Sequence, residues 1–266
     1  MKITIVGCGN MGMIYARSFL KYGLVVSDKL LLVEKSEARR DELSALNIGK
    51  VTIPDDVLVQ SSDIIILAVK PQDFDELAPI LNKVISSNNL VISIMAGITI
   101  PFIEQALGTS RMVRAMPNSP AQLGMGITGY SCSDQLSRED ILLAENLLST
   151  TGRSIYFKEE HMLNAVTAIS GSGPAYFFYI VKYMVEASKQ LGIAEHIANN
   201  LVMQTMLGAF HVMNEKNKTL DELIEAVSSK GGTTEAAFRV FSEAQLGENL
   251  AKGILQACHR AEELAK

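Results

Sequence analysis

The first half of the chain alternates short, continuously apolar runs with longer segments whose apolar residues recur at helical spacing. Continuously apolar runs are typical of strands that are buried on both faces of a parallel sheet. Strand–helix–strand repetition with short links therefore predicts a parallel sheet with right-handed crossovers. The predicted strands are Ile3–Val6, Leu30–Val33, Asp63–Val69, Leu90–Ile94, Arg111–Met116, Met125–Tyr130 and Ser154–Phe157, and the predicted helices are Met11–Tyr22, Ser36–Leu46, Phe74–Ile85 and Arg138–Ser149.

From about Glu160 onward, the apolar pattern is helical throughout. Pro174 supplies a first-turn proline for a long helix that runs to Gly192, a residue suited to a C-terminal stop. Thr219 and Glu222 form a capping box at the start of another helix. Further helices are predicted over Ala194–Asn214, Thr234–Leu246 and Glu248–Leu264, with Gly247 separating the last two.

Proline is distributed unevenly along the chain. All seven prolines lie at or before Pro174, so the last 266 − 174 = 92 residues contain none. Because proline marks turns and is excluded from helix interiors, we predict two domains. These are an α/β domain over residues 1–159 and an all-helical domain over residues 160–266. The helical segment Ile193–Met213 is apolar on more than one face, which indicates burial between subunits.

Composition and charge exclude several classes of protein. With 48% apolar and 20% charged residues, the chain is not disordered. The net charge of 24 − 29 = −5 leaves no basic face for phosphates, so we expect no nucleic-acid partner. No uncharged stretch approaches the roughly 20 apolar residues of a membrane span. Three scattered cysteines, no histidine pair at metal spacing and no signal peptide before the first strand favour a cytoplasmic protein without a metal.

A glycine-rich segment follows the first predicted strand, opens the first helix and matches G-x-G-x-x-G. In this pattern the first glycine permits a tight turn, the second lets the backbone approach a pyrophosphate, and the third lets the helix pack on the strand. The positive N-terminus of the helix then points at the phosphates. An ordinary strand–helix turn is the alternative, but the segment stands in the context that a Rossmann-like, mostly parallel dinucleotide-binding domain requires. The predicted cofactor-binding residues are Gly7, Gly9, Asn10, Met11 and Gly12.

The residues after the second strand do not decide whether the cofactor carries a 2′-phosphate. An acidic residue at this place binds the adenosine ribose and favours NAD(H), and Glu34 stands there. Lys35, Ser36 and Arg39 follow and are able to hold the 2′-phosphate of NADP(H), although Lys35 and Arg39 also fit a solvated helix start. We therefore expect NADP(H) or NAD(H) as the cofactor, with Glu34, Lys35 and Ser36 at its adenosine end.

Two later strand ends are further candidates for cofactor binding. Open α/β sheets bind ligands at the carboxyl ends of their strands, and small residues there let a nicotinamide ring approach. Each segment alone is an ordinary strand end, but both are expected at the same edge of the sheet. The residues are Ala68, Val69, Lys70 and Pro71 after one strand, and Met95, Ala96 and Gly97 after the next.

Three polar loops exceed what a scaffold needs. Arg114–Ala121 is bracketed by prolines, and Ile169–Tyr176 joins the two domains with two glycines and two serines. A stiff turn and a capped hinge are the structural alternatives for these two loops. Ser229–Glu235 places a glycine pair at a helix start, where free N–H groups and the positive helix end suit a small carboxylate.

Through these loops, the chain resembles the pyrroline-5-carboxylate reductases, which catalyse the last step of proline biosynthesis. The resemblance implies a Rossmann domain and a C-terminal helical dimerisation domain through which two chains interleave. It also implies a homodimer or higher homo-oligomer with a shared active site. The matching residues, in the expected order over almost the whole chain, are Gly-x-Gly-Asn-Met-Gly at the N-terminus, Ala68–Gln72, Arg114–Ala121, Ser170–Tyr176, Gln204, Thr205, Gly208 and Gly231–Thr234.

The resemblance also implies a mechanism and a set of substrate-binding residues. A hydride passes from the nicotinamide to the C=N carbon of the imino acid Δ1-pyrroline-5-carboxylate and gives L-proline, with the cofactor supplying the chemistry. Thr234 matches the catalytic position, where its hydroxyl bonds the ring nitrogen. The backbone N–H groups of Gly232 and Thr233, together with Ser229, match the site for the carboxylate. Glu160 matches an acidic position near the substrate, although acids are favoured at helix starts in any case.

Two departures from the family pattern bear on rival functions. Lys230 stands where the family usually has proline, and Asp55 stands where it often has asparagine. A β-hydroxyacid dehydrogenase needs a catalytic lysine at the start of the interdomain helix, and Tyr176–Ile180 contains none. A regulatory protein that has lost the activity is the other alternative. Lys230 favours it, whereas the intact Gly232–Thr234 opposes it.

Overall fold

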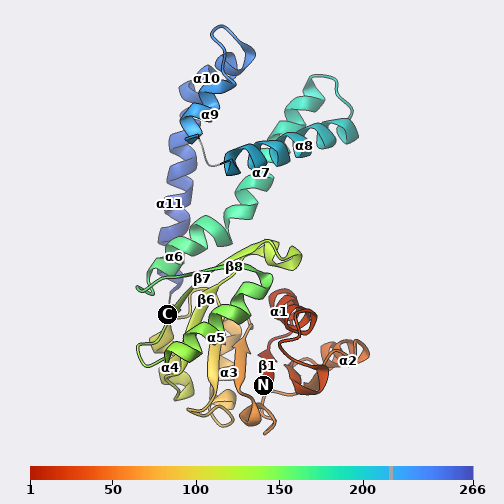
Figure 1. Ribbon diagram of the computed structural model, residues 1–266, viewed down its shortest axis with the longest axis vertical. Coiled ribbons are helices and arrows are strands. Elements are labelled where there is room, and N and C mark those ends of the chain that lie inside the picture. The colour runs from red at the N-terminus through yellow and green to blue at the C-terminus, as the bar shows by residue number, and fades with distance from the viewer. Residues whose placement is uncertain (216–217, 266) are drawn as a thin grey trace. The chain divides into compact units, whose positions relative to one another are not determined.

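The computed structural model describes residues 1–215 and 218–265, and the chain divides into two compact units (Figure 1). Unit 1 comprises Met1–Ser172 and Ala257–Lys266, and unit 2 comprises Gly173–Gln256. This division lies later in the chain than the predicted boundary at residue 160, because the short helix α6 (Met162–Val166) contacts the sheet of unit 1. A Cβ built on Gly129 would lie 2.8 Å from Val166 Cγ1, which shows how closely α6 approaches the sheet.

A single sheet forms the centre of unit 1, with the strand order β3-β2-β1-β4-β5-β6-β7-β8 among the described residues. Every neighbouring pair is parallel except β6 and β7, which form an antiparallel hairpin. The order runs outward in both directions from β1, as in a doubly wound sheet, and confirms the predicted mostly parallel fold. The strands are β1 Ile3–Val6, β2 Leu30–Val33, β3 Lys50–Thr52, β4 Ile64–Leu67, β5 Leu90–Ser93, β6 Met112–Met116, β7 Gly126–Cys132 and β8 Gly152–Tyr156.

Helices cover both faces of this sheet and create two hydrophobic cores. On one face, Phe19 of α1 and Leu43 of α2 pack against strand residues, and on the other Phe74 of α3 and Ile103 of α4 do the same. All four side chains are 0% exposed, and full burial of each contributes about 1.5–3 kcal/mol. The helices of unit 1 are α1 Asn10–Lys21, α2 Glu37–Ala45, α3 Pro71–Leu81, α4 Ile100–Leu107, α5 Arg138–Leu148 and α6.

Unit 2 is helical, as the proline-free pattern predicts. Its helices α7 and α8 contact each other through a small core that includes Val185, Ala198 and Val202. The capping box at the start of α9 is present, because the Thr219 hydroxyl accepts from the Glu222 N–H and the Glu222 carboxylate accepts from the Thr219 N–H at 2.7 Å. The helices are α7 Gly173–Gln190, α8 Glu195–Asn214, α9 Leu220–Ala226, α10 Thr233–Glu243 and α11 Leu246–Leu264, the last of which continues into unit 1.

Two local predictions for the helices were wrong. The break between α10 and α11 falls at Gln245, whose φ is +50°, and Gly247 lies inside α11. The first residues of the predicted loop Ile169–Tyr176 lie instead in a π-helical turn, Thr167–Gly171, that follows α6 directly. Among the described residues, no helix is long and apolar enough to cross a membrane.

Candidate functional site

The glycine-rich loop joins β1 to α1 and brings its backbone against the end of β4. Gly7 has a φ of +93°, and a Cβ built on it would lie 2.7 Å from Val69 Cγ1. A Cβ on Gly12 would collide with the carbonyl oxygen of Gly7 and would lie 3.2 Å from the Cβ of Ala68. Both positions therefore require glycine, for the turn and the close packing that the motif predicts.

Gly9 and the first turn of α1 form an open cradle beside this contact. Nothing lies within 4 Å of a Cβ built on Gly9, so this glycine faces open space. Gly9 caps α1 without a side-chain hydrogen bond. Among the described residues, the first turn of α1 carries no acidic side chain. The first N–H groups of the helix, including those of Asn10 and Met11, are therefore available to a phosphate at the positive end of the helix. The pyrophosphate of a dinucleotide fits this cradle.

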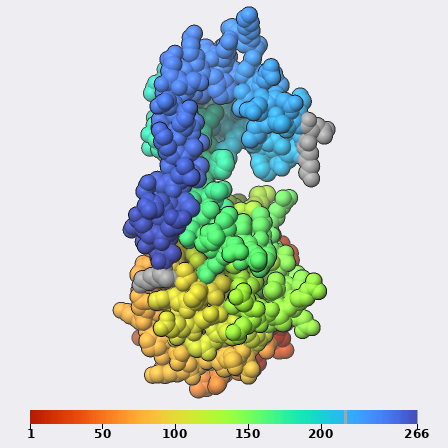
Figure 2. Space-filling model, turned by 90° about the vertical axis from the view of Figure 1, so that its left-hand side faces the viewer, coloured from red at the N-terminus to blue at the C-terminus, as the bar shows by residue number. Residues whose placement is uncertain are grey.

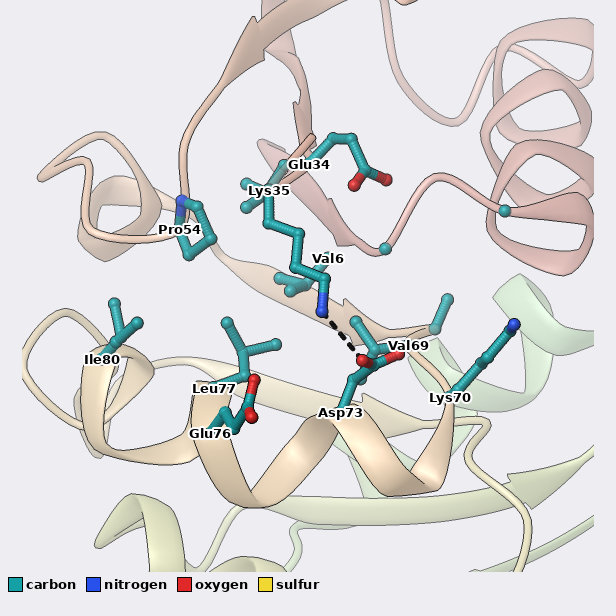
Figure 3. A pocket seen from close by; sticks show the side chains of 14 residues that line it. Val6, Glu34, Lys35, Pro54, Val69, Lys70, Asp73, Glu76, Leu77 and Ile80 are labelled. Atoms are coloured by element: carbon teal, nitrogen blue, oxygen red, sulfur yellow. Dashed lines mark hydrogen bonds and ion pairs between the residues drawn. The ribbon is translucent and has the colours of Figure 1, made fainter. Parts of the chain in front are cut away.

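A cavity of about 260 Å³ lies beside the loop, where β1, β2 and β4 end (Figure 3). Val6, Val69 and Leu77 form an apolar part of its wall. Lys35 reaches Asp73 on α3, with Nζ 2.8 Å from Oδ1, and this hydrogen bond raises the pKa of Lys35. The lining residues are Val6, Gly7, Gly9, Val33, Glu34, Lys35, Pro54, Ala68, Val69, Lys70, Asp73, Glu76, Leu77 and Ile80.

The carboxylate of Glu34 lies over the glycine-rich loop rather than in solvent. Its Oε2 accepts a hydrogen bond from the Cys8 N–H at 3.3 Å, and its Oε1 accepts one from the Ser36 N–H at 3.1 Å. The hydroxyl of Ser36 caps α2 by accepting from the Arg39 N–H at 3.4 Å. Glu34 is therefore held by one backbone donor of the glycine-rich loop and one of the β2–α2 turn.

The segment Ala68–Pro71 leads from β4 into α3. The Ala68 N–H donates to the Val6 carbonyl at 2.8 Å and extends the pairing of β4 with β1 by one residue. Lys70 is the N-cap of α3 and Pro71 is its first residue, where the missing N–H of proline removes no helical hydrogen bond. Pro71 therefore begins α3, and β4 already ends at Leu67.

Met95, Ala96 and Gly97 follow β5 at the same edge of the sheet. The side chain of Met95 is 2% exposed and belongs to the core beneath α3 and α4. Gly97 has a φ of +74°, and a Cβ on it would lie 2.9 Å from the Leu264 carbonyl oxygen. In Figure 2 the dark blue C-terminal end of α11 meets the orange-to-yellow surface of unit 1. Gly97 is thus required by its turn and by the close approach of the C-terminal residues.

An ion pair ties Glu160 to the centre of unit 1. Its Oε1 accepts a hydrogen bond from Arg114 Nη1 at 2.8 Å and another from the Ile100 N–H at 2.8 Å. The side chain of Arg114 is only 4% exposed, and that of Glu160 is 22% exposed. Burial, together with the charge of Glu160, raises the pKa of Glu104 on α4. Glu160 therefore joins β6 to the start of α4.

The segment that contains Ser229, Gly232, Thr233 and Thr234 forms the start of α10 in unit 2. Gly232 is the N-cap, its N–H donates to the Ser229 carbonyl at 2.9 Å, and a Cβ on it would lie 2.5 Å from Ser229 Oγ. Gly231 has a φ of +71°, and its N–H donates to the carboxylate of Glu235 one turn into the helix. The loop thus already binds a carboxylate through a backbone donor.

The structure brings seven of the fifteen predicted cofactor residues together in one cavity, whereas Asn10, Met11, Gly12, Ser36, Pro71, Met95, Ala96 and Gly97 do not line it. Gly7, Gly9, Glu34 and Lys35 share one cavity with Ala68–Lys70. The prediction missed Asp73, whose acidic position in the first turn of a helix was a detectable signal. It also missed the pairing of Arg114 with Glu160, which no sequence spacing indicates. The described residues contain no group of three or more side chains placed to hold a metal ion.

Comparisons with known proteins agree with this geometry. A family profile described as pyrroline-5-carboxylate reductase dimerisation matches residues 160–264, and one described as NADP oxidoreductase coenzyme F420-dependent matches residues 2–97. The pyrroline-5-carboxylate reductase of Vibrio alginolyticus is 35% identical, over 100% of this chain and 98% of its own.

Two solved structures resemble the whole chain. A pyrroline-5-carboxylate reductase from Coxiella burnetii is 33% identical with a TM-score of 0.87, over 100% of this chain and 98% of its own. The pyrroline carboxylate reductase of Plasmodium falciparum, solved with NADP bound, is 23% identical with a TM-score of 0.88, over 100% and 98% of the two chains. The second likeness concerns the fold alone.

Proposed function

The chain belongs to the pyrroline-5-carboxylate reductase family, and on that premise we propose how its own residues carry out the reaction. The enzyme reduces the C=N bond of Δ1-pyrroline-5-carboxylate to L-proline with a hydride from a nicotinamide dinucleotide. The chemistry has two requirements of the protein. One is a cradle for the dinucleotide, and the other is a site that holds a small imino acid by its carboxylate and its ring nitrogen.

Unit 1 meets the first requirement. The open space at Gly9 and the free N–H groups at the start of α1 would hold the pyrophosphate, with Asn10, Met11 and Gly12 forming the first turn. Glu34, Lys35 and Ser36 would face the adenosine ribose. When bound, the reduced dinucleotide supplies the hydride. The residues assigned to its nicotinamide end are Ala68, Val69, Lys70, Pro71, Met95, Ala96 and Gly97.

The start of α10 meets the second requirement. The observation that supports this assignment most is the hydrogen bond from the Gly231 N–H to the chain's own Glu235 carboxylate, because it places a carboxylate against a backbone donor at this helix start. The N–H of Thr233 and the hydroxyl of Ser229 would hold the substrate carboxylate, joined by the Gly232 N–H once it turns from the Ser229 carbonyl, to which it donates at 2.9 Å in the single chain. The Thr234 hydroxyl would bond the ring nitrogen and orient the C=N bond. With the imine bound in its protonated form, the site needs no separate acid to complete the reduction.

Glu160 acts in this account as a positioning residue. Its carboxylate accepts from the Arg114 guanidinium and from the Ile100 N–H, so it holds β6 and the start of α4 together. The segment Met95–Gly97 leads directly toward α4, and the ion pair therefore steadies the wall assigned to the nicotinamide. This role places Glu160 near the reacting groups without requiring it to exchange a proton.

Unit 2 would pair with a second copy of the chain. The chain forms a homo-oligomer through the helical region, and a dimer that completes its active sites with both chains is the proposed form. A large set of apolar side chains on α7 and α8 is exposed in the single chain, as an interface between copies requires. The set includes Phe177, Phe178, Tyr179, Tyr183, Met184, Leu201, Met203, Leu207 and Phe210.

The functional boundary between the domains is proposed at residue 160, with residues 1–159 binding the dinucleotide and residues 160–266 binding substrate and partner. The dimerisation profile begins at residue 160 and supports this choice. A cytoplasmic location is proposed as well, because Cys8, Cys132 and Cys258 are free thiols. No nucleic-acid partner is proposed, given the net charge of −5.

A direct assay tests the proposed function. The purified full chain is mixed with Δ1-pyrroline-5-carboxylate and reduced dinucleotide, and the absorbance of the dinucleotide is followed with and without the imino acid. We expect oxidation that depends on the imino acid and a matching amount of proline in the product. If neither NADH nor NADPH is oxidised, the result contradicts the assignment. Light scattering of the eluting protein measures the oligomeric state in the same preparation.

A further inference from the structure

The carboxylate of Glu34 occupies the place that decides which dinucleotide fits. Glu34 follows β2 directly and is held by the Cys8 N–H and the Ser36 N–H, at 3.3 and 3.1 Å. Figure 3 shows it at the edge of the cavity on the side of the glycine-rich loop. In dinucleotide-binding folds, an acid at this point accepts a hydrogen bond from the ribose 2′-hydroxyl, which NADH carries free and NADPH carries as a phosphate ester.

The three cations near Glu34 are engaged elsewhere. Lys35 turns across the cavity to Asp73, at 2.8 Å (Figure 3). Arg40 donates to the backbone carbonyls of Glu34 and Lys35, at 3.1 and 2.7 Å. Arg39 pairs with Glu42 at 2.5 Å and donates to the Cys8 carbonyl at 3.3 Å. A 2′-phosphate would therefore have to share these cations with the acceptors that they already contact.

The carboxylates of the cavity wall also disfavour a 2′-phosphate. The cavity lining carries the three carboxylates Glu34, Asp73 and Glu76, whereas the guanidinium groups of Arg39 and Arg40 lie near Glu34 but outside the lining. A 2′-phosphate monoester brings about −1.5 to −2 further charges near neutral pH. Like charges placed together at a binding surface cost several kcal/mol, whereas a hydroxyl that donates to a fixed carboxylate is favourable.

We propose that Glu34 makes this enzyme select NADH over NADPH, by accepting a hydrogen bond from the 2′-hydroxyl of the adenosine ribose and repelling a 2′-phosphate there. The inference rests on the proposed function as a dinucleotide-dependent reductase and specifies its cofactor. It also resolves the opposing sequence signals. Lys35, Ser36 and Arg39 have the residue types of a phosphate site, but their side chains are committed to Asp73, to the cap of α2 and to Glu42.

Binding measurements on the full chain test the proposal independently of turnover. Dissociation constants for NADH and NADPH are measured by calorimetry, with 5′-ADP and 2′,5′-ADP as probes of the adenosine end alone. We expect NADH to bind at least about tenfold more tightly than NADPH, and 5′-ADP more tightly than 2′,5′-ADP. Equal or tighter binding of the 2′-phosphorylated partner in either pair overturns the proposal. Failure of all four to bind contradicts the dinucleotide function itself, and with it the inference.

Substitutions assign the preference to the carboxylate. Glu34→Gln keeps the shape and one of the two acceptor oxygens but removes the charge, so the ratio of the two dissociation constants should move toward NADPH by about tenfold. Asp73→Asn releases Lys35 and should shift the ratio in the same direction even if Glu34→Gln disturbs the loop. Glu37→Gln, in the exposed first turn of α2 and outside the cavity lining, is the matched control and should leave the ratio unchanged. An unchanged ratio in both Glu34→Gln and Asp73→Asn overturns the proposal.

Discussion

The guanidinium of Arg114 lies 2.8 Å from the carboxylate of Glu160, joining two residues 46 positions apart in the chain. Removing one partner of a buried ion pair leaves the other charge uncompensated. We therefore expect Glu160→Ala to lower the free energy of unfolding by about 3 kcal/mol, as measured by urea denaturation.

The neighbouring acid Glu104 supplies the control for this prediction. Burial and then the charge of Glu160 raise the pKa of Glu104, and the two carboxylates repel one another. Glu104→Gln should therefore be neutral or slightly stabilising. Equal losses of stability in Glu160→Ala and Glu104→Gln would show that the ion pair has no special role.

The glycines of the loop should respond to substitution in two different ways. Gly12→Ala places a methyl group against the Gly7 carbonyl, so we expect it to destabilise the fold by about 1–3 kcal/mol. Gly9→Ala meets no protein atom within 4 Å and should fold normally, yet the methyl group would enter the space assigned to the pyrophosphate. Thermal unfolding and dinucleotide titration separate the two effects. Dinucleotide affinity unchanged by Gly9→Ala would remove this loop from the binding site.

The ion pair between Arg111 and Asp140 should contribute stability that depends on pH. Burial opposes ionisation of Asp140, but hydrogen bonds from Arg111 and Ser137 outweigh it and hold its pKa below the ordinary 3.8. A carboxyl with a lowered pKa contributes stability above its unfolded pKa, and this contribution is lost as the pH falls through the folded value. Asp140→Asn should therefore be less stable than the parent at pH 7, with a gap that closes below pH 3.8. Urea titrations across this range measure the gap, and a gap independent of pH would contradict the assignment.

Much of unit 1 is predictable from sequence because its central strands β1, β2, β4 and β5 are short and almost wholly apolar. The predicted Ile3–Val6 and Leu30–Val33 coincide with β1 and β2. Strand β3 (Lys50–Thr52) was not predicted, since it has three residues, begins with an exposed lysine and lies at the edge of the sheet. Helix α4 was missed as well, because Pro101 interrupts its pattern, although Thr99 caps it and proline is tolerated in a first turn.

The candidate site likewise contains features that the sequence predicts and features that it does not. The glycine-rich loop is readable because backbone geometry dictates residue type at Gly7 and Gly12. The partners of Lys35 are not readable, because ion pairing with Asp73 depends on where α3 begins, and that differs by three residues from the predicted start at Phe74. Contacts between side chains far apart in sequence depend on packing, and local pattern does not encode them.

The hydroxyl of Thr234 should matter for turnover more than for folding. Thr234→Val keeps the shape of the side chain and removes the hydrogen bond assigned to the ring nitrogen, so we expect kcat/KM to fall by about ten- to a hundredfold. Thr234→Ser restores the hydroxyl and should recover most of the loss. Both variants should unfold at nearly the parent temperature. Unchanged kinetics in Thr234→Val would remove this residue from the site.

The transfer of a labelled hydride tests whether this chain reduces the C=N bond with a nicotinamide dinucleotide. The full chain is incubated with Δ1-pyrroline-5-carboxylate and NADH carrying deuterium at both positions of nicotinamide C4, and the product is analysed by mass spectrometry. We expect L-proline that contains one deuterium, located at the carbon that formed the C=N bond. Proline without deuterium, or oxidation of NADH without proline, would contradict it.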